Sequence, residues 1–374
     1  MKIGILSVAA SMALLCACQP ATTKTTISGN LSDMGSNTLI VQSMPVNREG
    51  SPKRDTVVMQ NGAFTLELDL DTIPAEVHIF PKPGIGQMAR IDNINFVIFP
   101  NESLTVSGNI DKYTVEGSDF YAAYNEAIRG WQTYEDSLQS LSAQAQKMER
   151  EGVAADSIEA FYAPAEELMQ KMLDTQLEYI RQHPDSDVAL YIASRIGYRK
   201  VKEVFPLLSD NVKTGKLAPL YQMMDNALKR EEARIEAKKN IVEGATAPDF
   251  TLKDIEGNDL TLSSLRGKYV VLDFWGSWCI KGMPEMKKYY AKYGNRMEIL
   301  GIDCRDTEEK WKEAVKKHEL PWLHVRNAGD TDVSLLYAIE GYPTKIVIDP
   351  DGKITKLVLG EDPAFYEYID KLFK

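Results

Sequence analysis

A cysteine and an acid lie at one junction in the last third of this 374-residue chain. Cys279 follows the run Phe274-Trp275-Gly276-Ser277-Trp278, and Asp273 comes directly before that run. Where a buried strand gives way to a helix, a cysteine can sit at the helix N-terminus, and there the backbone N–H groups and the helix dipole favour the thiolate. Because the thiolate is the nucleophile of disulfide exchange, this junction predicts thiol chemistry.

The composition narrows the other function classes. The net charge of −11 and the lack of a Lys/Arg run argue against a nucleic-acid partner, which would require basic patches that meet phosphates. The four histidines are scattered and none lies at metal-ligand spacing from a cysteine or another histidine, so we expect no metal and no other cofactor. Four cysteines, two of them in the leader, are too few for a disulfide framework.

The beginning of the chain has the pattern of an export signal. Lys2 gives a positive start, and the apolar run over residues 3–15 is short for a bilayer-spanning helix, which favours a cleaved signal peptide over residues 1–17. The run ends in Leu15-Cys16-Ala17-Cys18, which resembles a bacterial lipobox with Cys18 as the lipidated residue. A plain secretory signal with incidental cysteines is the alternative.

A polar tether over residues 18–25 follows the expected lipidation site. Acyl chains anchor a protein by burying methylenes, at about 0.8 kcal/mol each, and several chains make the attachment stable. We therefore expect a lipid-anchored protein of the cell envelope that faces the periplasm, with exposure at the cell surface as the alternative. Export also places the chain where disulfides persist.

Residues 26–117 show the period-two pattern of strands. Phe64, Leu66 and Leu68 alternate with polar residues directly after Asn61-Gly62, and such a pair before an alternating strand predicts a hairpin. Further short runs predict strands over 38–41, 76–80, 95–99 and 103–107. We expect a small antiparallel β domain, built as a sandwich.

Between residues 118 and 240 the period becomes helical. Apolar residues recur in steps of four and three from Phe120 to Met148, which predicts one long helix with a single apolar stripe. A second stripe runs from Phe161 to Tyr179. Both stripes indicate a helical core, and the alternative use of such a stripe is a dimer or partner groove.

Residues 241–374 alternate between strands and helices. Largely apolar runs predict buried parallel strands over 269–275 and 297–302. The later elements are predicted as a helix over 307–318, strands over 344–349 and 357–359, and a final helix over 363–373. The chain as a whole is thus expected to be multidomain α+β, with an N-terminal β-sandwich, a middle helical region and a C-terminal three-layer α/β domain.

Motifs in this last region resemble those of a known family. The matching segments are Gly244-x-x-Ala247-Pro248-Asp249-Phe250, Leu262-Ser263-x-Leu265-x-Gly267-Lys268, Phe274-Trp275-Gly276-Ser277-Trp278-Cys279 and Gly341-Tyr342-Pro343-Thr344. They resemble the thioredoxin-like domains of membrane-anchored thiol–disulfide oxidoreductases of the TlpA/ResA type, in the AhpC/TSA redoxin superfamily. The β and helical regions also resemble the amino-terminal part common in one branch of these lipoproteins.

The resemblance implies a thioredoxin-like fold for residues 241–374. It implies exported protein thiols or disulfides as substrates and a membrane thiol reductant as a partner. It also implies that Pro343 follows a cis peptide bond and faces the active-site cysteine, beside Trp278. Many thioredoxins carry a buried acid at the position of Asp273, where burial raises its pKa and suits it to accept a proton from the inner cysteine.

The chain departs from the family pattern Trp-Cys-x-x-Cys. It reads Trp278-Cys279-Ile280-Lys281-Gly282-Met283-Pro284, so Gly282 stands where the second cysteine belongs. When the family pattern Cys-Ile-Lys-Gly-x-Pro is aligned on Pro284, Cys279 instead matches the second cysteine. A deletion of three residues that fused the two cysteine positions into one explains both alignments. Three residues is close to one helical turn, so we expect the helix to start late, with Pro284 first, and Cys279 to lie in the preceding loop.

A single thiol cannot cycle between a dithiol and an internal disulfide, although it can form a mixed disulfide with a partner. Cys304 is the other thiol of this domain, and the family fold places its strand beside the strand before Cys279. We hypothesise that the two are near enough to couple, which for a bridge requires Cα atoms within about 7 Å. A buried apolar role for Cys304 is the favoured alternative.

The sequence is compatible with two function classes. The first is a thiol–disulfide oxidoreductase reduced to one cysteine, and the second is a redox-inactive thioredoxin-fold module that holds a partner protein. A peroxiredoxin is excluded, because its Pro-x-x-x-Thr-x-x-Cys pattern would place Pro and Thr where this chain has Leu272 and Gly276.

Overall fold

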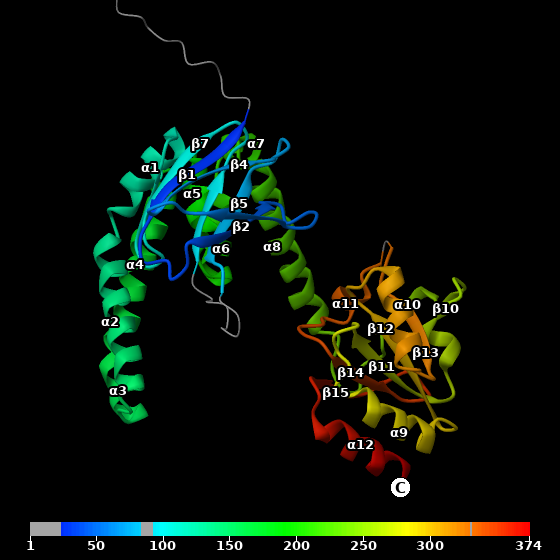
Figure 1. Ribbon diagram of the computed structural model, residues 1–374. Coiled ribbons are helices and arrows are strands. Elements are labelled where there is room, and N and C mark those ends of the chain that lie inside the picture. The colour runs from blue at the N-terminus through cyan, green and yellow to red at the C-terminus, as the bar shows by residue number, and fades with distance from the viewer. Residues whose placement is uncertain (1–23, 84–92, 330) are drawn as a thin grey trace, which may run out of the picture. The chain divides into compact units, whose positions relative to one another are not determined.

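The computed structural model describes residues 24–83, 93–329 and 331–374 (Figure 1). These residues form two compact units, the first ending at Asp225 and the second spanning Asn226–Lys374. The predicted signal peptide, the lipidation site Cys18 and the tether up to residue 23 lie outside the described residues. Within the described ranges, no helix combines the length and the apolar character needed to cross a membrane.

Two four-stranded sheets form the β part of the first unit. One has the order β4-β1-β7-β8 and consists of β1 (Thr25–Leu31), β4 (Ala63–Leu68), β7 (Ser103–Gly108) and β8 (Tyr113–Glu116). The other has the order β3-β2-β5-β6 and consists of β2 (Thr38–Pro45), β3 (Lys53–Val58), β5 (Ala75–Pro81) and β6 (Ile94–Ile98). The prediction of a purely antiparallel domain is wrong for one pair, because β1 and β7 run parallel. The strands of the second sheet lie between β1 and β7 in the chain. They supply the long crossover connection that a parallel pair of strands needs.

The Asn61-Gly62 pair forms the tight turn that the sequence predicts. Both residues have positive φ, 52° and 85°, as a type I′ turn requires. Gln60 and Ala63 exchange both backbone hydrogen bonds across it, at 2.8 and 3.0 Å. Beyond that pair the strands separate, since β3 joins one sheet and β4 the other. The turn is confirmed, but it connects two sheets instead of closing an ordinary hairpin.

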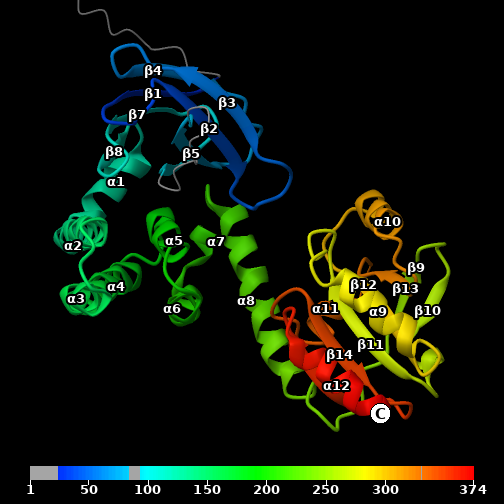
Figure 2. The ribbon, with the colours of Figure 1, turned by 60° about the horizontal axis from the view of Figure 1, so that its bottom comes forward.

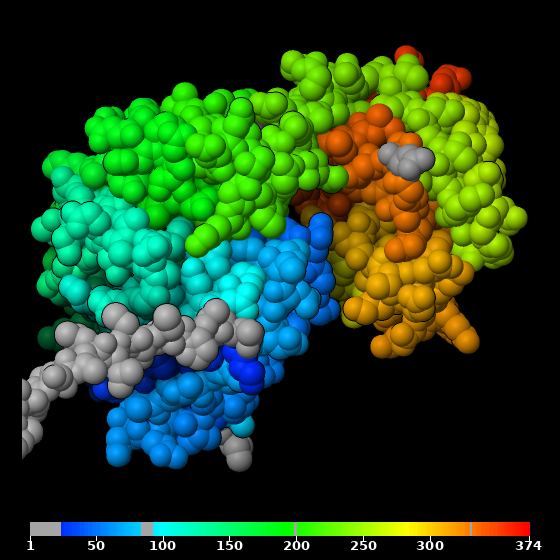
Figure 3. Space-filling model, turned by 90° about the horizontal axis from the view of Figure 1, so that it is seen from above, coloured from blue at the N-terminus to red at the C-terminus, as the bar shows by residue number. Residues whose placement is uncertain are grey.

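Helices make up the rest of the first unit, and α8 continues into the second. They are α1 (Asp119–Ile128), α2 (Gln132–Arg150), α3 (Ala155–Tyr162), α4 (Pro164–Gln182), α5 (Asp187–Ala193), α6 (Tyr198–Val204), η1 (Phe205–Leu207), α7 (Asp210–Thr214) and α8 (Ala218–Lys238). In the space-filling view the helical segments of the first unit, in teal and green, border the blue strands (Figure 3).

The single helix expected from Phe120 to Met148 is in fact two, α1 and α2. The break falls at Gly130, where glycine disfavours helix, and at Trp131, which turns inward and keeps only 2% of its surface exposed. The apolar stripe continues along α2, but its residues are only half-buried, next to α3 and α4. The stripe therefore serves packing within the unit, which leaves less apolar surface for a dimer than the sequence alone suggested.

The second unit is built on one seven-stranded sheet of order β10-β9-β13-β12-β11-β14-β15. Its strands are β9 (Thr251–Asp254), β10 (Asp259–Thr261), β11 (Tyr269–Trp275), β12 (Met297–Asp303), β13 (Leu323–Arg326), β14 (Thr344–Ile348) and β15 (Ile354–Leu359). Its helices are η2 (Leu262–Leu265), α9 (Met283–Tyr293), α10 (Glu308–Lys317), α11 (Val333–Leu336) and α12 (Pro363–Phe373). The three central strands β11, β12 and β13 are parallel, and the outer strands pair antiparallel.

Separate hydrophobic cores cover the two faces of this sheet. One core holds side chains of α9, α10 and α12, such as Met286, Trp311 and Phe365, and we call this side the α9 face (Figure 2). The other holds Phe250, Leu262 and side chains around α11, and we call it the α11 face. Successive residues of a strand point to opposite faces, so neighbouring positions on β11 and β12 contribute to different cores.

Candidate functional site

Cys279 lies in the loop between β11 and α9, and its side chain belongs to the core of the α9 face. Its N–H donates to Gly276 O at 2.8 Å, which closes a tight turn. Helix α9 begins at Met283, with Pro284 second. The expected late start is confirmed, and its first residue is corrected by one position, because Met283 donates its N–H to Ile280 O at 3.2 Å and packs into the core.

The environment of Cys279 favours the thiol over the thiolate. Only 8% of the residue is exposed, and burial raises the pKa of the Cys279 thiol. The carboxylates of Asp273 and Glu361 act in the same direction, while the Gly276 backbone and the Lys345 charge oppose them. Helix α9 begins only after the loop that carries Cys279, so the helix terminus does not offset the burial. The fraction of Cys279 present as thiolate is therefore lower than for an exposed cysteine.

Asp273 points to the α9 face from β11 and is 1% exposed. Its partner across the sheet is Lys345 of β14, which is 2% exposed. Lys345 Nζ lies 3.7 Å from Asp273 Oδ1 and donates to Glu361 Oε1 at 3.0 Å. Burial raises the pKa of Asp273, and the Lys345 charge opposes that rise. Asp273 and Lys345 are buried, whereas the Glu361 side chain is 24% exposed.

The Glu361 carboxylate also lies close to position 282. A Cβ atom added to Gly282 would overlap the Glu361 carboxylate. The backbone of Gly282, at φ −83° and ψ −14°, is open to any residue, so the Glu361 carboxylate, and not the backbone conformation, is the obstacle to a side chain here. The Glu361 carboxylate thus fills the space that a side chain at position 282 would need.

Cys304 comes directly after β12, and its N–H donates to Trp275 O at 3.1 Å. Both cysteines therefore lie at the same edge of the sheet, as the resemblance implied. They belong to different faces, however, because Cys304 packs against the core of the α11 face and accepts a hydrogen bond from Ser334 Oγ at 3.3 Å. Both thiols are free, and burial raises the pKa of Cys304 to about 12.

This separation predicts the result of an oxidation experiment. With the sheet between the two side chains, we expect the folded protein to keep Cys279 and Cys304 as thiols after mild oxidation. Alkylation followed by peptide mass spectrometry counts each thiol separately, whatever happens to the cysteines of the leader. The same treatment in urea, where the chain is free to bring the two sulfurs together, is the control. A Cys279–Cys304 linked peptide from the folded protein would contradict the expectation.

Trp278 contacts the loop that contains Pro343, through Tyr342. The Trp278 ring covers Gly276, where a Cβ would overlap the indole, and lies edge-on to Tyr342 with 6.4 Å between ring centroids. The Tyr342–Pro343 peptide bond is cis, as the resemblance implied. The ring contact places the cis-proline loop against the turn that carries Cys279.

Exposed apolar side chains surround this meeting point. Trp278, Ile280 and Leu359 expose 52%, 44% and 60% of their surfaces, and we call them the apolar rim. Leu359 pairs with Thr344 and lies next to Gly341, so it borders the cis-proline loop. Exposed apolar residues gathered around one site are typical of a surface that contacts another protein.

Sequence reasoning missed Lys345 and Glu361. The signal for Lys345 was a lysine inside the otherwise apolar strand Thr344–Ile348, a position that requires a buried counter-charge. No local pattern pointed to Glu361, which precedes α12 and joins the site only through the fold. Ser277 and Asp306, which hold the Cys279 turn from its other side, were missed for the same reason.

The second unit has parallel central strands, with Cys279 in the loop after the central strand β11 and a cis-proline loop against that turn. These features define a thioredoxin-like protein. The AhpC/TSA family matches residues 244–357. The chain is 37% identical over 128 residues to the thiol-disulfide oxidoreductase ResA of a Bacillus cereus strain, which covers 33% of this chain and 73% of that protein. It is 34% identical over 129 residues to ResA of Bacillus subtilis (strain 168), with 33% and 70% covered. Through its second unit, this chain belongs to the ResA family of thiol–disulfide oxidoreductases.

Two solved structures to which the chain is similar come from Bacteroides. The thioredoxin domain of a thiol-disulfide oxidoreductase from Bacteroides vulgatus is 32% identical, with a TM-score of 0.33, and 36% of this chain and 99% of that one are covered. A thiol:disulfide interchange protein from Bacteroides sp. is 33% identical, with a TM-score of 0.33, and 35% and 90% are covered.

Proposed function

We propose that this protein acts on exported protein thiols and disulfides through Cys279 alone, with less redox activity than a two-cysteine relative. The Cys279 thiolate would attack a disulfide of the partner protein, form a mixed disulfide and release the second partner sulfur as a thiolate. Because Gly282 supplies no resolving thiol, a second thiol from the partner or from an external reductant would release the adduct. The observation that carries this proposal is that the turn of Cys279 contacts the cis-proline loop through Trp278 and Tyr342, while the nearby position 282 is a glycine without a thiol.

The apolar rim supports a protein as the substrate. Trp278, Ile280 and Leu359 give an approaching chain apolar contacts on the cysteine turn and on the strand after the cis-proline loop. Tryptophan is the residue type that most often provides large binding contributions at protein interfaces. Trp278 is therefore assigned a substrate-contacting role and Asp273 a role in proton exchange near Cys279.

The proposed location is the periplasmic side of the cell envelope, with Cys18 as the lipid-bearing residue. The support is the short apolar run, the lipobox-like Leu15-Cys16-Ala17-Cys18 and the polar segment after it. In the first unit, the alternation of buried and exposed residues on β1 and β2 favours two sheets packed as a sandwich.

A second candidate is a redox-inactive module that holds a partner protein. The raised pKa of the Cys279 thiol favours it, because the thiolate needed for exchange is scarce at neutral pH. In this case the apolar rim and the cis-proline loop would bind the partner without covalent chemistry.

Replacement of Cys279 by serine separates the two candidates. We expect the full chain to form a mixed disulfide with glutathione disulfide and with a disulfide-bearing peptide, and Cys279→Ser to reduce the yield at least ~10-fold, since the remaining Cys304 is the less acidic thiol. Cys304→Ser is the matched control and should keep the wild-type yield. If Cys279→Ser leaves the yield unchanged, or if the wild type forms no adduct at all, the binding module is the better assignment.

A further inference from the structure

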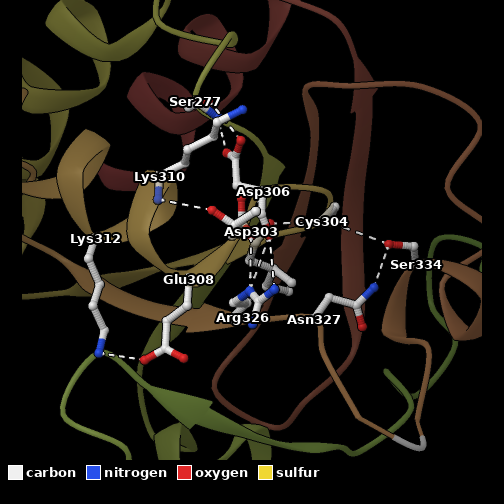
Figure 4. Close-up of polar contacts among 12 residues, drawn as sticks. Ser277, Asp303, Cys304, Asp306, Glu308, Lys310, Lys312, Arg326, Asn327 and Ser334 are labelled. Carbon is white, nitrogen blue, oxygen red and sulfur yellow. Dashed lines mark hydrogen bonds and ion pairs between the residues drawn. The ribbon is translucent and has the colours of Figure 1, made fainter. Parts of the chain in front are cut away.

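Two acids, Asp303 and Asp306, lie near Ser277, which precedes Cys279 by two residues (Figure 4). Asp303 is the last residue of β12, pairs with Trp275 in the register of the sheet and is 1% exposed. Asp306 follows in the loop before α10 and is 9% exposed. Neither residue belongs to the sequence motifs of the family, and the exchange chemistry proposed above uses neither.

Asp306 fixes the turn through Ser277, two residues before Cys279. One carboxylate oxygen accepts the Ser277 N–H at 2.6 Å, and the other accepts the Ser277 hydroxyl at 2.8 Å. Arg326 in turn holds the Asp306 backbone, because its Nε and one terminal nitrogen donate to Asp306 O at 3.2 and 3.0 Å. Asp306 is therefore a positioning residue for the turn that carries the nucleophile.

Asp303 sits next to this clamp without a strong partner of its own. Among the described residues, no group satisfies its two oxygens with a hydrogen bond of normal geometry, and Arg326 Nε is 4.0 Å away. Burial and the neighbouring carboxylate of Asp306 raise the pKa of Asp303 to about 7. The group thus changes charge near pH 7.

The other groups around Asp303 leave Asp306 as its main charged neighbour. On β13, Arg326 provides the one opposing charge, and burial lowers the pKa of His324 to about 4, so that histidine is neutral. On β11, the nearest acid is Asp273, two residues before Trp275 and engaged with Lys345. Helix α10 brings Glu308 and Lys310 to the edge of the cluster (Figure 4).

We propose that Asp303 and Asp306 form a proton-sharing carboxyl pair that holds the Cys279 turn when Asp303 is protonated and loosens it when Asp303 is ionised. With one proton between them, Asp306 keeps its two bonds to Ser277. When the proton leaves to solvent, two buried carboxylates repel each other and the bonds to Ser277 weaken. The pair is thus a pH-dependent control of the redox site, and only this last consequence depends on the proposed function.

The Ser277 amide reports the state of the pair without any redox assay. In amide-detected NMR of the full chain, we expect its chemical shift to pass through one inflection near pH 7. Asp303→Asn should abolish the inflection and leave the amide near its low-pH position, while Asp306→Asn should displace it at every pH. Asp254→Asn is the matched control, because the Asp254 carboxylate also accepts backbone N–H groups, in a loop distant in sequence. The proposed pair would be contradicted if the Ser277 amide shift of the wild type did not change with pH. It would also be contradicted if the inflection persisted in Asp303→Asn.

A stability measurement covers the case in which the NMR signal is lost. The folded pKa of Asp303 is raised above the unfolded value, so its ionisation costs stability as pH rises from about 4 to 7, and the cost levels off above that. The stability of Asp303→Asn relative to the wild type should therefore increase over this interval. A constant difference between the two across this range would also contradict the proposal.

The link to the redox site is tested by the alkylation rate of Cys279, read by peptide mass spectrometry at pH 6 and pH 8. For a thiol that is mostly protonated, the thiolate fraction alone increases the rate ~100-fold over two pH units. We expect Asp303→Asn to show that increase and the wild type to exceed it, because the loosened turn exposes the sulfur. Equal increases of the alkylation rate in the wild type and in Asp303→Asn would contradict the regulatory role of the pair. If Cys279 failed to form mixed disulfides while the Ser277 inflection persisted, only the proposed function would be contradicted.

Discussion

Replacing Lys345 with methionine is expected to destabilise the second unit by about 3 kcal/mol at pH 8, as loss of one partner from a buried ion pair usually does. Lys345 and Asp273 are 2% and 1% exposed, so water cannot replace the lost cation beside Asp273. The loss should shrink toward pH 5. Without Lys345 the pKa of Asp273 rises further, and a group with a raised folded pKa contributes stability at low pH that is lost as pH increases.

Urea unfolding followed by tryptophan fluorescence measures this effect in the full chain, because four of the five tryptophans lie in the second unit. Lys356→Met on the neighbouring strand β15 is the matched control. Its partner is Glu243 at 3.4 Å and both side chains are exposed, so the change should cost less than ~1 kcal/mol. The double variant Lys345→Met with Asp273→Asn should recover most of the loss. If it is as unstable as the single variant, Lys345 stabilises the sheet by packing and not by charge.

Introducing a cysteine at position 282 is expected to give a dithiol site that forms its disulfide poorly. In Gly282→Cys the new side chain must displace the Glu361 carboxylate, which accepts a bond from buried Lys345 at 3.0 Å. A hydrogen bond to a charged group is worth about 1.5–3 kcal/mol. At about 1.4 kcal/mol for each factor of ten, the equilibrium constant for a disulfide between Cys279 and the introduced cysteine should be lowered ~10- to 100-fold.

The comparison that isolates this effect is Gly282→Cys with and without Glu361→Ala, each equilibrated in glutathione redox buffers. The double variant removes the obstructing carboxylate and should form the bridge more readily by the factor given above. Gly282→Ala measures the steric cost without a second sulfur and should destabilise the fold in the same direction. Equal disulfide constants for the single and double variants would show that Glu361 moves aside freely.

The elements that hold the site could largely be predicted from the sequence. Strand β11 and helix α12 have the predicted bounds, because a continuous apolar run marks a buried strand and Asp362-Pro363 marks a helix start. Strand β3 was missed since its residues are mostly exposed and carry no alternation. The break between α1 and α2 depends on the burial of Trp131, which is a property of the packed unit.

The chemistry of the site was less predictable than its position. The run before Cys279 located the thiol, but its protonation depends on burial and on Glu361, which is 82 positions away in the chain. Likewise, Cys304 was correctly placed at the sheet edge that it shares with Cys279. The face that its side chain occupies depends on the register between β12 and β11, which the sequence does not give. Contacts between distant segments decide these properties, and a single sequence gives no direct measure of them.

The overlap between Gly282 and Glu361 also bears on how such a site changes over generations. The Glu361 carboxylate, which accepts a bond from buried Lys345, occupies the space beside Gly282, so a codon change that introduces a cysteine there gains little while Glu361 stays in place. A change at Glu361 would have to come first, and that step alone leaves Lys345 with Asp273 as its remaining acid partner at 3.7 Å. The order of the two substitutions therefore decides whether a second thiol at position 282 finds room to bond with Cys279.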